Sequence, residues 1–234
     1  MPESAAMNTS SGSDRARRAF AYLRRRITSG EWPVGSRIPV ETELMELLGV
    51  GKMTVREAVR SLASMGMLET LPGRGTYVRA RTPVAAVLAE SVHDYELAEV
   101  LAYRRGLEVE AARLAARHRT DDHVARLRAA HEANDRLGAG APAEREQGRT
   151  PQEFHALVFE ATGTRLLPDA YAGVLAALRK VISLGVVIYA SGEESRRHDH
   201  GQILAAIEAG DAERAALLMA QHVADDLEIA GPGR

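Results

Sequence analysis

From Pro83 almost to the C-terminal end, the apolar residues recur at helical spacing, and no alternating strand pattern of useful length interrupts them. The breaks fall at residues that begin or end helices, among them Gly163 and the pair Gly210-Asp211. The pattern predicts helices over 84–92, 95–118, 121–137, 152–161, 166–190, 193–209 and 211–229. Amphipathic helices bury their apolar stripes against one another, so an all-α helical bundle is expected.

The residues before Pro83 follow a different order. Helical spacing begins at Asp14 and stops before Gly30, and two further helices are predicted over 41–48 and 53–65. Two β-prone segments, Leu68–Leu71 and Thr76–Val78, then flank a Pro-Gly-Arg-Gly turn. The expected fold is therefore mostly α, with an N-terminal winged helix-turn-helix and its β-hairpin ahead of the bundle.

Composition and charge suggest the domain boundaries. The expected arrangement is a disordered tail over 1–13, the winged domain over 14–79, a linker over 80–83 and the bundle over 84–230. Residues 14–82 hold 13 Lys and Arg against 7 Asp and Glu, whereas residues 83–234 hold 17 against 24. A basic first part joined to an acidic second part predicts that the first part meets a polyanion.

The absence of cysteine excludes a disulfide framework, a thiolate metal site and a cysteine protease. No apolar run approaches the roughly 20 residues that span a bilayer, and the N-terminal segment does not resemble a signal peptide. We therefore expect a cytoplasmic protein without a membrane partner.

The helix over 53–65 has the character of a DNA recognition helix. Its apolar face carries Val55, Ala58, Val59 and Leu62, while Arg56 and Arg60 lie on the opposite face. Arginine side chains there can reach guanine acceptors in the major groove. Lys52 at the helix start and Arg74 between two glycines are suited to phosphate contacts.

Three ordered motifs resemble the DNA-binding domain of the GntR family of bacterial regulators. They are Gly35-Ser36-Arg37-Ile38-Pro39-Val40-Glu41, then Val50-Gly51-Lys52-Met53-Thr54-Val55-Arg56-Glu57-Ala58-Val59, and finally Gly73-Arg74-Gly75-Thr76-Tyr77-Val78. The resemblance implies DNA-binding roles for Arg37, Glu41, Lys52, Thr54, Arg56, Arg60, Gly73 and Arg74. The chain departs from the family pattern at Thr42, Gly51, Lys52 and Met53, so the operator sequence does not carry over.

Polar residues interrupt the apolar stripes of the predicted bundle. Arg104 and Glu108 fall within the stripe of the helix over 95–118, and unpaired charges in a core cost several kcal/mol, so both need partners. His155, His200 and His222 face inward on three different helices. Neutral imidazoles on facing helices can bind a divalent transition metal such as zinc, nickel or manganese.

This half resembles the all-helical (FCD) ligand-binding domain of the FadR-type branch of the same family. The resemblance rests on Arg104-Arg105-Gly106-Leu107-Glu108, Phe154-His155, His200, Gly210-Asp211 and His222-Val223. It implies a homodimer in which Arg104, Glu108 and the three histidines bind an effector, with His155, His200 and His222 as metal ligands. Metal-binding members carry an Asp four residues before the first His, where this chain has Pro151.

The expected function is a DNA-binding transcription regulator, a repressor of operator DNA that responds to a small organic acid, and not an enzyme. Arg104 is expected to clamp the carboxylate of that acid. Two alternatives remain open at this point. One is a metal-dependent enzyme that activates water at the three histidines; the other is a DNA-binding protein with a degenerate sensing site, as Pro151 suggests.

Overall fold

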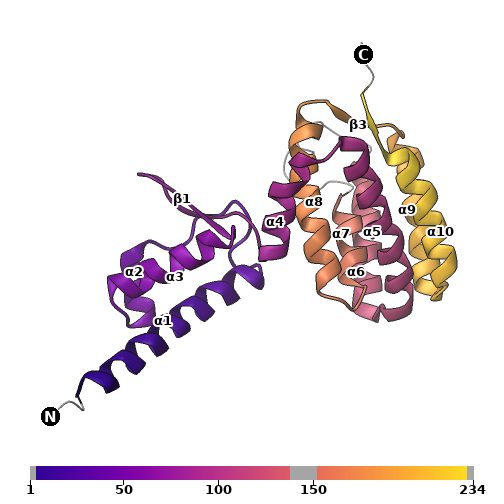
Figure 1. Cartoon of the computed structure of the whole chain (residues 1–234). Coiled ribbons are helices and arrows are strands. Elements are labelled where there is room, and N and C mark those ends of the chain that lie inside the picture. The colour runs from indigo at the N-terminus through magenta and orange to yellow at the C-terminus, as the bar shows by residue number, and fades with distance from the viewer. Residues whose placement is uncertain (1–3, 138–151, 231–234) are drawn as a thin grey trace. The chain divides into compact units, whose positions relative to one another are not determined.

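A computed structural model describes residues 4–137 and 152–230, with side chains over 14–133 and 153–230. The chain divides into two compact units, Met1–Glu90 and Ser91–Arg234. Helices dominate both units, and each unit contains one small two-stranded antiparallel sheet in the part of the chain described (Figure 1). The prediction of a mostly helical chain with a winged first domain is confirmed.

Three helices form the body of the first unit. They are α1 (Ser4–Thr28), α2 (Glu41–Leu48) and α3 (Lys52–Ser64). Gly49 ends α2 with a φ of 61°, a left-handed conformation that glycine adopts without strain. Apolar side chains from all three helices share one core, which contains Ala19, Leu23, Ile27, Ile38, Leu44, Val55, Ala58, Leu62, Met67, Leu68 and Val78.

The wing consists of β1 (Leu68–Leu71) and β2 (Gly75–Val78). The strands are antiparallel, and their register pairs Leu68 with Val78 and Leu71 with Gly75. The segment before α2 adds a short third edge, because Ile38 N donates to Thr76 O over 2.9 Å. The hairpin predicted from the Pro-Gly-Arg-Gly turn is therefore present, one residue longer at the start of its second strand.

The ends of the first unit differ from the sequence-based expectation. The helix α1 begins at Ser4, inside the segment expected to be a disordered tail. That expectation rested on small polar residues, but between Ser4 and Asp14 no proline interrupts a helix. At the other end, α4 (Pro83–Ser91) begins at the last residue of the expected linker, and most of α4 groups with the first unit.

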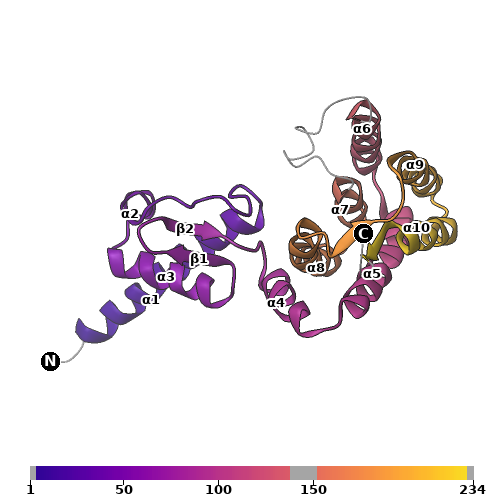
Figure 2. The same cartoon turned by 90° about the horizontal axis from the view of Figure 1, so that it is seen from above.

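The second unit is the predicted helical bundle, seen nearly end-on in Figure 2. After the short 3-10 helix η1 (Val92–Asp94) come α5 (Leu97–His118), α6 (Asp121–Leu137), α7 (Gln152–Glu160), α8 (Leu166–Ser183), α9 (Glu193–Ala209) and α10 (Ala212–Asp226). The helix α5 packs against α7, α8, α9 and α10. It therefore connects most of the bundle, and its inward side chains reach several neighbours.

The expectation that this unit contains only helices is wrong in one place. Strands β3 (Val187–Tyr189) and β4 (Leu227–Ile229) pair antiparallel, where the sequence predicted the ends of two long helices. Gly185, with a φ of 70°, follows the end of α8, and the β-branched residues after it favour an extended chain. A three-residue strand is too short to show an alternating pattern.

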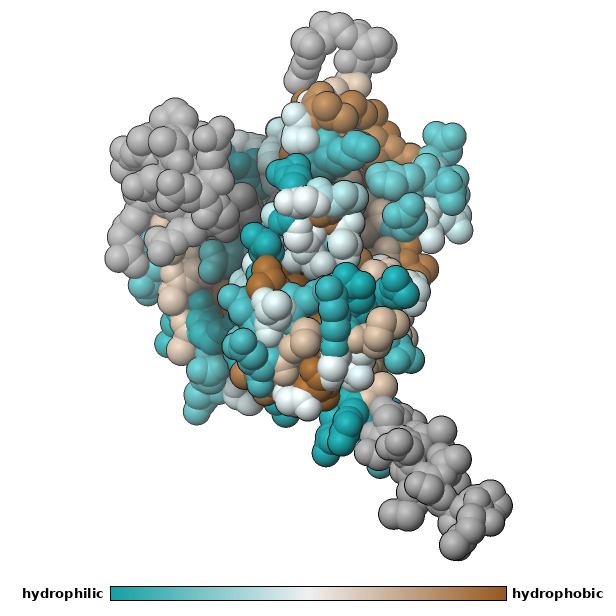
Figure 3. Space-filling model, turned by 90° about the vertical axis from the view of Figure 1, so that its left-hand side faces the viewer, coloured by the Kyte–Doolittle hydropathy of each residue, from teal (hydrophilic) through white to brown (hydrophobic). Residues whose placement is uncertain are grey.

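The largest core of the second unit contains apolar residues of the six helices α5 to α10. Phe154, Phe159, Ile203, Ile207 and Met219 are among its fully buried members. Hydrophilic residues cover much of one face of the molecule in Figure 3, as expected for a chain with 26% charged residues. Within the described ranges, no helix is both long and apolar enough to cross a membrane.

Candidate metal centre and nucleic-acid interface

The helix α3 exposes the side chains that the sequence assigned to DNA. Val55, Ala58 and Leu62 are buried in the core, whereas Arg56 and Arg60 are exposed. The exposed set also contains Lys52, Met53 and Glu57, and Thr54 is half-buried. This face can meet a major groove without disturbing the core, because none of its exposed members contributes to the packing of the unit.

Glu41, at the start of α2, holds two of these cations. Arg56 Nε donates to Glu41 Oε1 over 2.8 Å, and Lys52 Nζ lies 3.8 Å from Glu41 Oε2. The hydrogen bond from Arg56 is the main cause of a lowered pKa of Glu41. Glu41 therefore positions Arg56 on the exposed face in the absence of DNA.

The remaining residues of the predicted DNA set lie at the wing. Arg37, Gly73 and Arg74 are exposed, and Arg37 forms a β-bridge with Tyr77 of β2. Gly73 has a φ of 72°, which the turn between β1 and β2 requires. The structure thus places Arg74 at the turn of the hairpin, Arg37 on the segment that bridges to β2, and Arg56 and Arg60 on the helix α3, all within the first unit.

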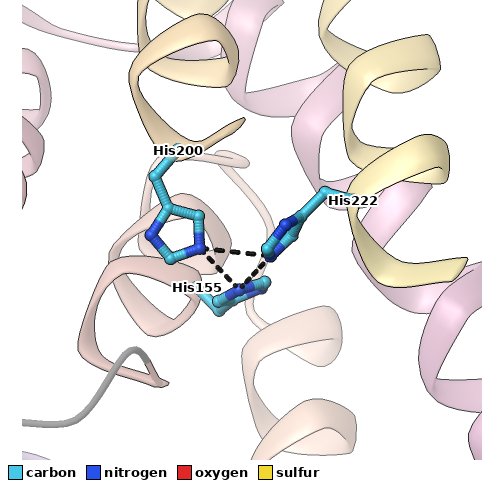
Figure 4. A group of neighbouring side chains, drawn as sticks. All are labelled: His155, His200 and His222. Atoms are coloured by element: carbon cyan, nitrogen blue, oxygen red, sulfur yellow. Dashed lines mark hydrogen bonds between the residues drawn. The ribbon is translucent and has the colours of Figure 1, made fainter. Parts of the chain in front are cut away.

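The three inward histidines meet in the core of the second unit. His155 comes from α7, His200 from α9 and His222 from α10, and each is at most 3% exposed. Their Nε2 atoms form a triangle: His200 lies 3.2 Å from His155 and 3.1 Å from His222, and His155 and His222 are 3.2 Å apart (Figure 4). The convergence predicted from the helix faces is present.

In two of the three histidines, the second ring nitrogen, Nδ1, faces a carboxylate. His155 Nδ1 lies 2.9 Å from Glu108 Oε1, although poorly aligned as a hydrogen bond, and His222 Nδ1 lies 3.3 Å from Asp199 Oδ2. A carboxylate at Nδ1 favours the tautomer that carries its proton there. The Nε2 lone pairs of those rings then point at one another, an arrangement that a cation between them would stabilise.

The spacing of the triangle suits a metal ion. Three nitrogens that each lie about 2.0–2.1 Å from one ion are separated by about 2.8–3.4 Å across octahedral and tetrahedral geometries. The observed separations of 3.1–3.2 Å fall inside that interval. The three histidines therefore fit a divalent transition metal ion in donor type and in distance.

The cluster favours the neutral form of two of its imidazoles, the form that metal ligation requires. Burial lowers the pKa of His200 well below its usual value, and the neighbouring charges of His155 and His222 lower it further. Burial likewise lowers the pKa of His222, with an opposing contribution from Asp226. Both rings are thus available as ligands near neutral pH.

Arg104 and Glu108, whose positions in an apolar stripe required partners, are buried together with Asp226. Arg104 Nε and Nη2 lie 3.2 and 3.1 Å from Glu108 Oε1, and Nη2 lies 2.7 Å from Asp226 Oδ2. Burial alone would raise the pKa of Glu108, but the charges of His155 and Arg104 outweigh it and bring the pKa to about 2. The guanidinium is therefore paired with two carboxylates inside the protein, whereas a clamp on a ligand needs free donors.

Sequence reasoning missed Asp199, Asp226 and Arg196. Each has a signal in the spacing: Asp226 lies one helical turn after His222, Arg196 lies one turn before His200, and Asp199 adjoins His200. Arg196 and Asp226 are buried, with exposures of 9% and 2%. Pro151, on which the doubt about a fourth ligand depends, lies outside the described residues.

Comparisons with known proteins agree with both halves of the chain. Residues 15–78 match the family model "Bacterial regulatory proteins, gntR family", and residues 99–225 match the FCD domain. The Uxu operon transcriptional regulator of Escherichia coli K12 is 31% identical over 216 residues, which cover 87% of this chain and 81% of that protein. The HTH-type transcriptional regulator LutR of Bacillus subtilis is 26% identical over 208 residues, 84% of this chain and 92% of LutR.

One solved structure is similar over most of its length. The Streptococcus agalactiae GntR structure superposes with a TM-score of 0.53 at 27% sequence identity, and the match covers 90% of this chain and 97% of the other. The similarity thus spans both units of this chain and a chain of comparable length.

Proposed function

Because the chain belongs to the gntR family of bacterial regulatory proteins and carries an FCD domain, we propose that it is a repressor whose affinity for operator DNA changes when a small organic acid binds. It is a transcription regulator with a DNA-binding helix-turn-helix. Repression, the small organic acid as effector and the residues that bind it are the proposed parts. It also implies that the protein acts in the cytoplasm, where bacterial DNA lies.

We assign DNA reading to α3 and the wing. Arg56 and Arg60 are exposed on α3 and have the chemistry to contact guanine, and Thr54 lies at the margin of the same face. Lys52, Arg37 and Arg74 are suited to phosphate contacts, and Gly73 lets the wing approach the duplex closely. Glu41 contributes by positioning Arg56, with which it is hydrogen-bonded.

The observation that carries the sensing proposal is the buried triangle of Nε2 atoms. His155, His200 and His222 would hold one divalent metal ion, and Glu108 and Asp199 would orient two of the ligands. The bound ion supplies positive charge and open coordination positions to which a carboxylate can bind. Three protein ligands suffice for such a site, since catalytic zinc sites commonly have three.

The charges around the triangle of Nε2 atoms favour binding of the metal ion before binding of the acid. Arg104 contributes one positive charge, whereas Glu108 and Asp226 contribute two negative charges at hydrogen-bond distance from it. These three side chains together carry one net negative charge, which favours a cation nearby and disfavours a free carboxylate. An acid effector therefore needs a further positive charge, which the histidine ligands are suited to recruit.

The enzyme alternative has less support. The only inward carboxylate that the sequence offered as a general base, Glu108, is held by Arg104 and lies against His155. A residue in that position orients a ligand and is poorly placed to take a proton from water. The alternative of a degenerate sensing site is also less favoured, because three converging buried histidines are costly to retain without a ligand.

Regulation requires that the protein adopt two arrangements that differ in their affinity for operator DNA. We propose a homodimer whose two recognition helices bind the half-sites of a pseudo-palindrome, as helix-turn-helix dimers do. The acid changes operator affinity only by as much as it prefers one arrangement over the other. An effect of tenfold on operator affinity corresponds to a difference of about 1.4 kcal/mol.

The experiment is a selection of duplex DNA by the purified full-length protein, followed by fluorescence anisotropy on the selected sequence at fixed salt. Affinity is measured with and without zinc, and with a panel of small carboxylic acids. We expect sequence-specific binding that at least one acid weakens only when zinc is bound. Specific binding that no acid changes in either state would leave a DNA-binding regulator without the proposed sensing function.

A further inference from the structure

The buried Arg196 side chain has no role in the function described so far. The residue is 9% exposed and lies in the first turn of α9. Its Nη1 donates to the backbone carbonyl of Ser191, and its guanidinium carbon lies 4.8 Å from the centroid of the Tyr189 ring. Its Nε is buried without a hydrogen-bond partner. Among the described residues, no carboxylate lies within ion-pair distance of this guanidinium.

Arg196 and Arg104 are both buried arginines of the second unit, but their surroundings differ. Arg104 contacts two carboxylates, so its charge is compensated inside the protein. Arg196 has a backbone carbonyl and the face of an aromatic ring, which compensate a full charge only in part. A buried charge without a counter-charge costs several kcal/mol, so its retention indicates a partner that binds from outside the chain.

Its position points to the histidine cluster. Arg196 precedes His200 by one helical turn, so both side chains leave the same face of α9. The guanidinium is therefore within electrostatic reach of the triangle of Nε2 atoms.

We infer that Arg196 binds the carboxylate of the effector beside the histidine cluster, and that Arg104 does not. The inference rests on the proposed function, because it names the residue that recognises the acid at the same site. The Nε edge of a guanidinium can donate two parallel hydrogen bonds to a carboxylate, which would satisfy the orphaned Nε. The ligand class is a small carboxylic acid, with its anionic group between His200 and Arg196.

The test uses the full-length protein and two readouts. The first is the Tm of metal-free, ligand-free Arg196→Met. If Arg196 serves a ligand, this variant unfolds at the wild-type temperature or above it, because an uncompensated buried charge has been removed. A Tm lowered by several degrees would assign Arg196 a structural role and overturn the inference. Arg197→Met, which changes an exposed neighbour on the same helix, serves as the matched control.

The second readout is calorimetric titration of zinc-reconstituted protein with acetate, glycolate, malonate and succinate, with zinc content checked afterwards. We expect Arg196→Met to retain zinc and to weaken acid binding at least tenfold, Arg196→Lys to weaken it less, and Arg197→Met to behave as wild type. Equal binding by wild type and Arg196→Met would refute the inference and leave the proposed function intact. A wild-type protein that binds zinc but none of the acids would contradict both.

Discussion

His155, His200 and His222 owe their orientation to side chains that the sequence alone does not connect. Glu108 lies against His155, Asp199 contacts His222, and the ring of Phe154 stacks on His200 at 4.3 Å with an angle of 12° between the planes. Each ring is therefore fixed by a partner other than a metal ligand. A site whose ligands are oriented in advance binds its ion with less loss of side-chain entropy.

The Arg104 ion pairs give the first prediction at this scale. Arg104→Gln leaves Glu108 and Asp226 buried without their cation, and breaking such a group costs about 3–5 kcal/mol. We expect a corresponding loss in the free energy of unfolding, measured by urea titration with circular dichroism. Arg105→Gln, at an exposed adjacent position, should change the free energy little. Equal stabilities for the two variants would show that the ion pairs do not hold α5 to α10.

The recognition helix gives the second prediction. Arg56→Ala should lower affinity for the selected operator by about 1–3 kcal/mol, the range for an arginine that reads a base. Lys52→Ala should instead weaken binding to all duplexes similarly and reduce the salt dependence by about one counterion. Anisotropy at several salt concentrations separates the two effects. Unchanged operator affinity of Arg56→Ala would remove that residue from the reading set.

At the residue scale, the sequence predicts which side chains face inward but not which side chains of distant segments pair. The helical spacing was enough to bring His155, His200 and His222 to one place, because each lies on the apolar face of its helix. It was not enough to connect Arg104 with Asp226, since 122 residues separate them. A pairing between distant helices depends on the packing of the bundle, which spacing within one helix does not contain.

At the scale of the elements, glycines set where several helices end. Gly66 follows the last turn of α3 with a φ of 70°, and a Cβ there would lie 2.7 Å from the Cβ of Ala86 in α4. Gly106, in the middle of α5, has no heavy atom within 4 Å of such a Cβ. The same substitution is therefore expected to have opposite effects at the two positions.

The third prediction compares these substitutions. Gly66→Ala should destabilise the first unit by about 1–3 kcal/mol, because the left-handed backbone and the close contact both oppose a side chain. Trp32, the single tryptophan, lies in this unit and reports its unfolding by fluorescence. Gly106→Ala should stabilise the second unit by about 0.5–1 kcal/mol through helix propensity, measured by circular dichroism. Destabilisation by both substitutions would contradict this account of Gly106.

Most elements follow from local pattern, and the exceptions have a physical cause. The helices α2, α3 and α9 and the wing lie within a residue of their predicted bounds, because capping glycines and amphipathic spacing coincide there. The pair β3 and β4 joins segments from distant parts of the chain, Val187–Tyr189 and Leu227–Ile229. Strands of this length gain their stability from each other, so neither segment is distinctive by itself.

At the scale of the whole molecule, the chain joins a DNA-binding unit to a unit with a buried polar cluster. The basic charge of the first part and the acidic charge of the second are those expected when only the first contacts DNA. In the proposed mechanism, a ligand in the second unit influences the first through a change in the arrangement of two such chains. The regulatory proposal therefore depends on a dimer.

The fourth prediction concerns that dimer. Sedimentation equilibrium at micromolar concentration should give twice the 25.3 kDa of one chain without DNA, and that mass plus the mass of one duplex with DNA. A palindromic operator then presents its half-sites about one helical turn apart. A monomer under both conditions would contradict the proposed mechanism while leaving the DNA-binding assignment of α3 in place.

The claim that the three buried histidines hold one divalent metal ion is tested most directly by elemental analysis of protein purified without an affinity tag or chelator, and again after incubation with zinc and desalting. The account predicts about one ion per chain in the wild type. It predicts loss of that ion in His200→Ala and retention in His198→Ala, which changes an exposed histidine on the same helix. Wild-type protein that retains no zinc, nickel or manganese, or His200→Ala that retains as much as the wild type, would contradict it.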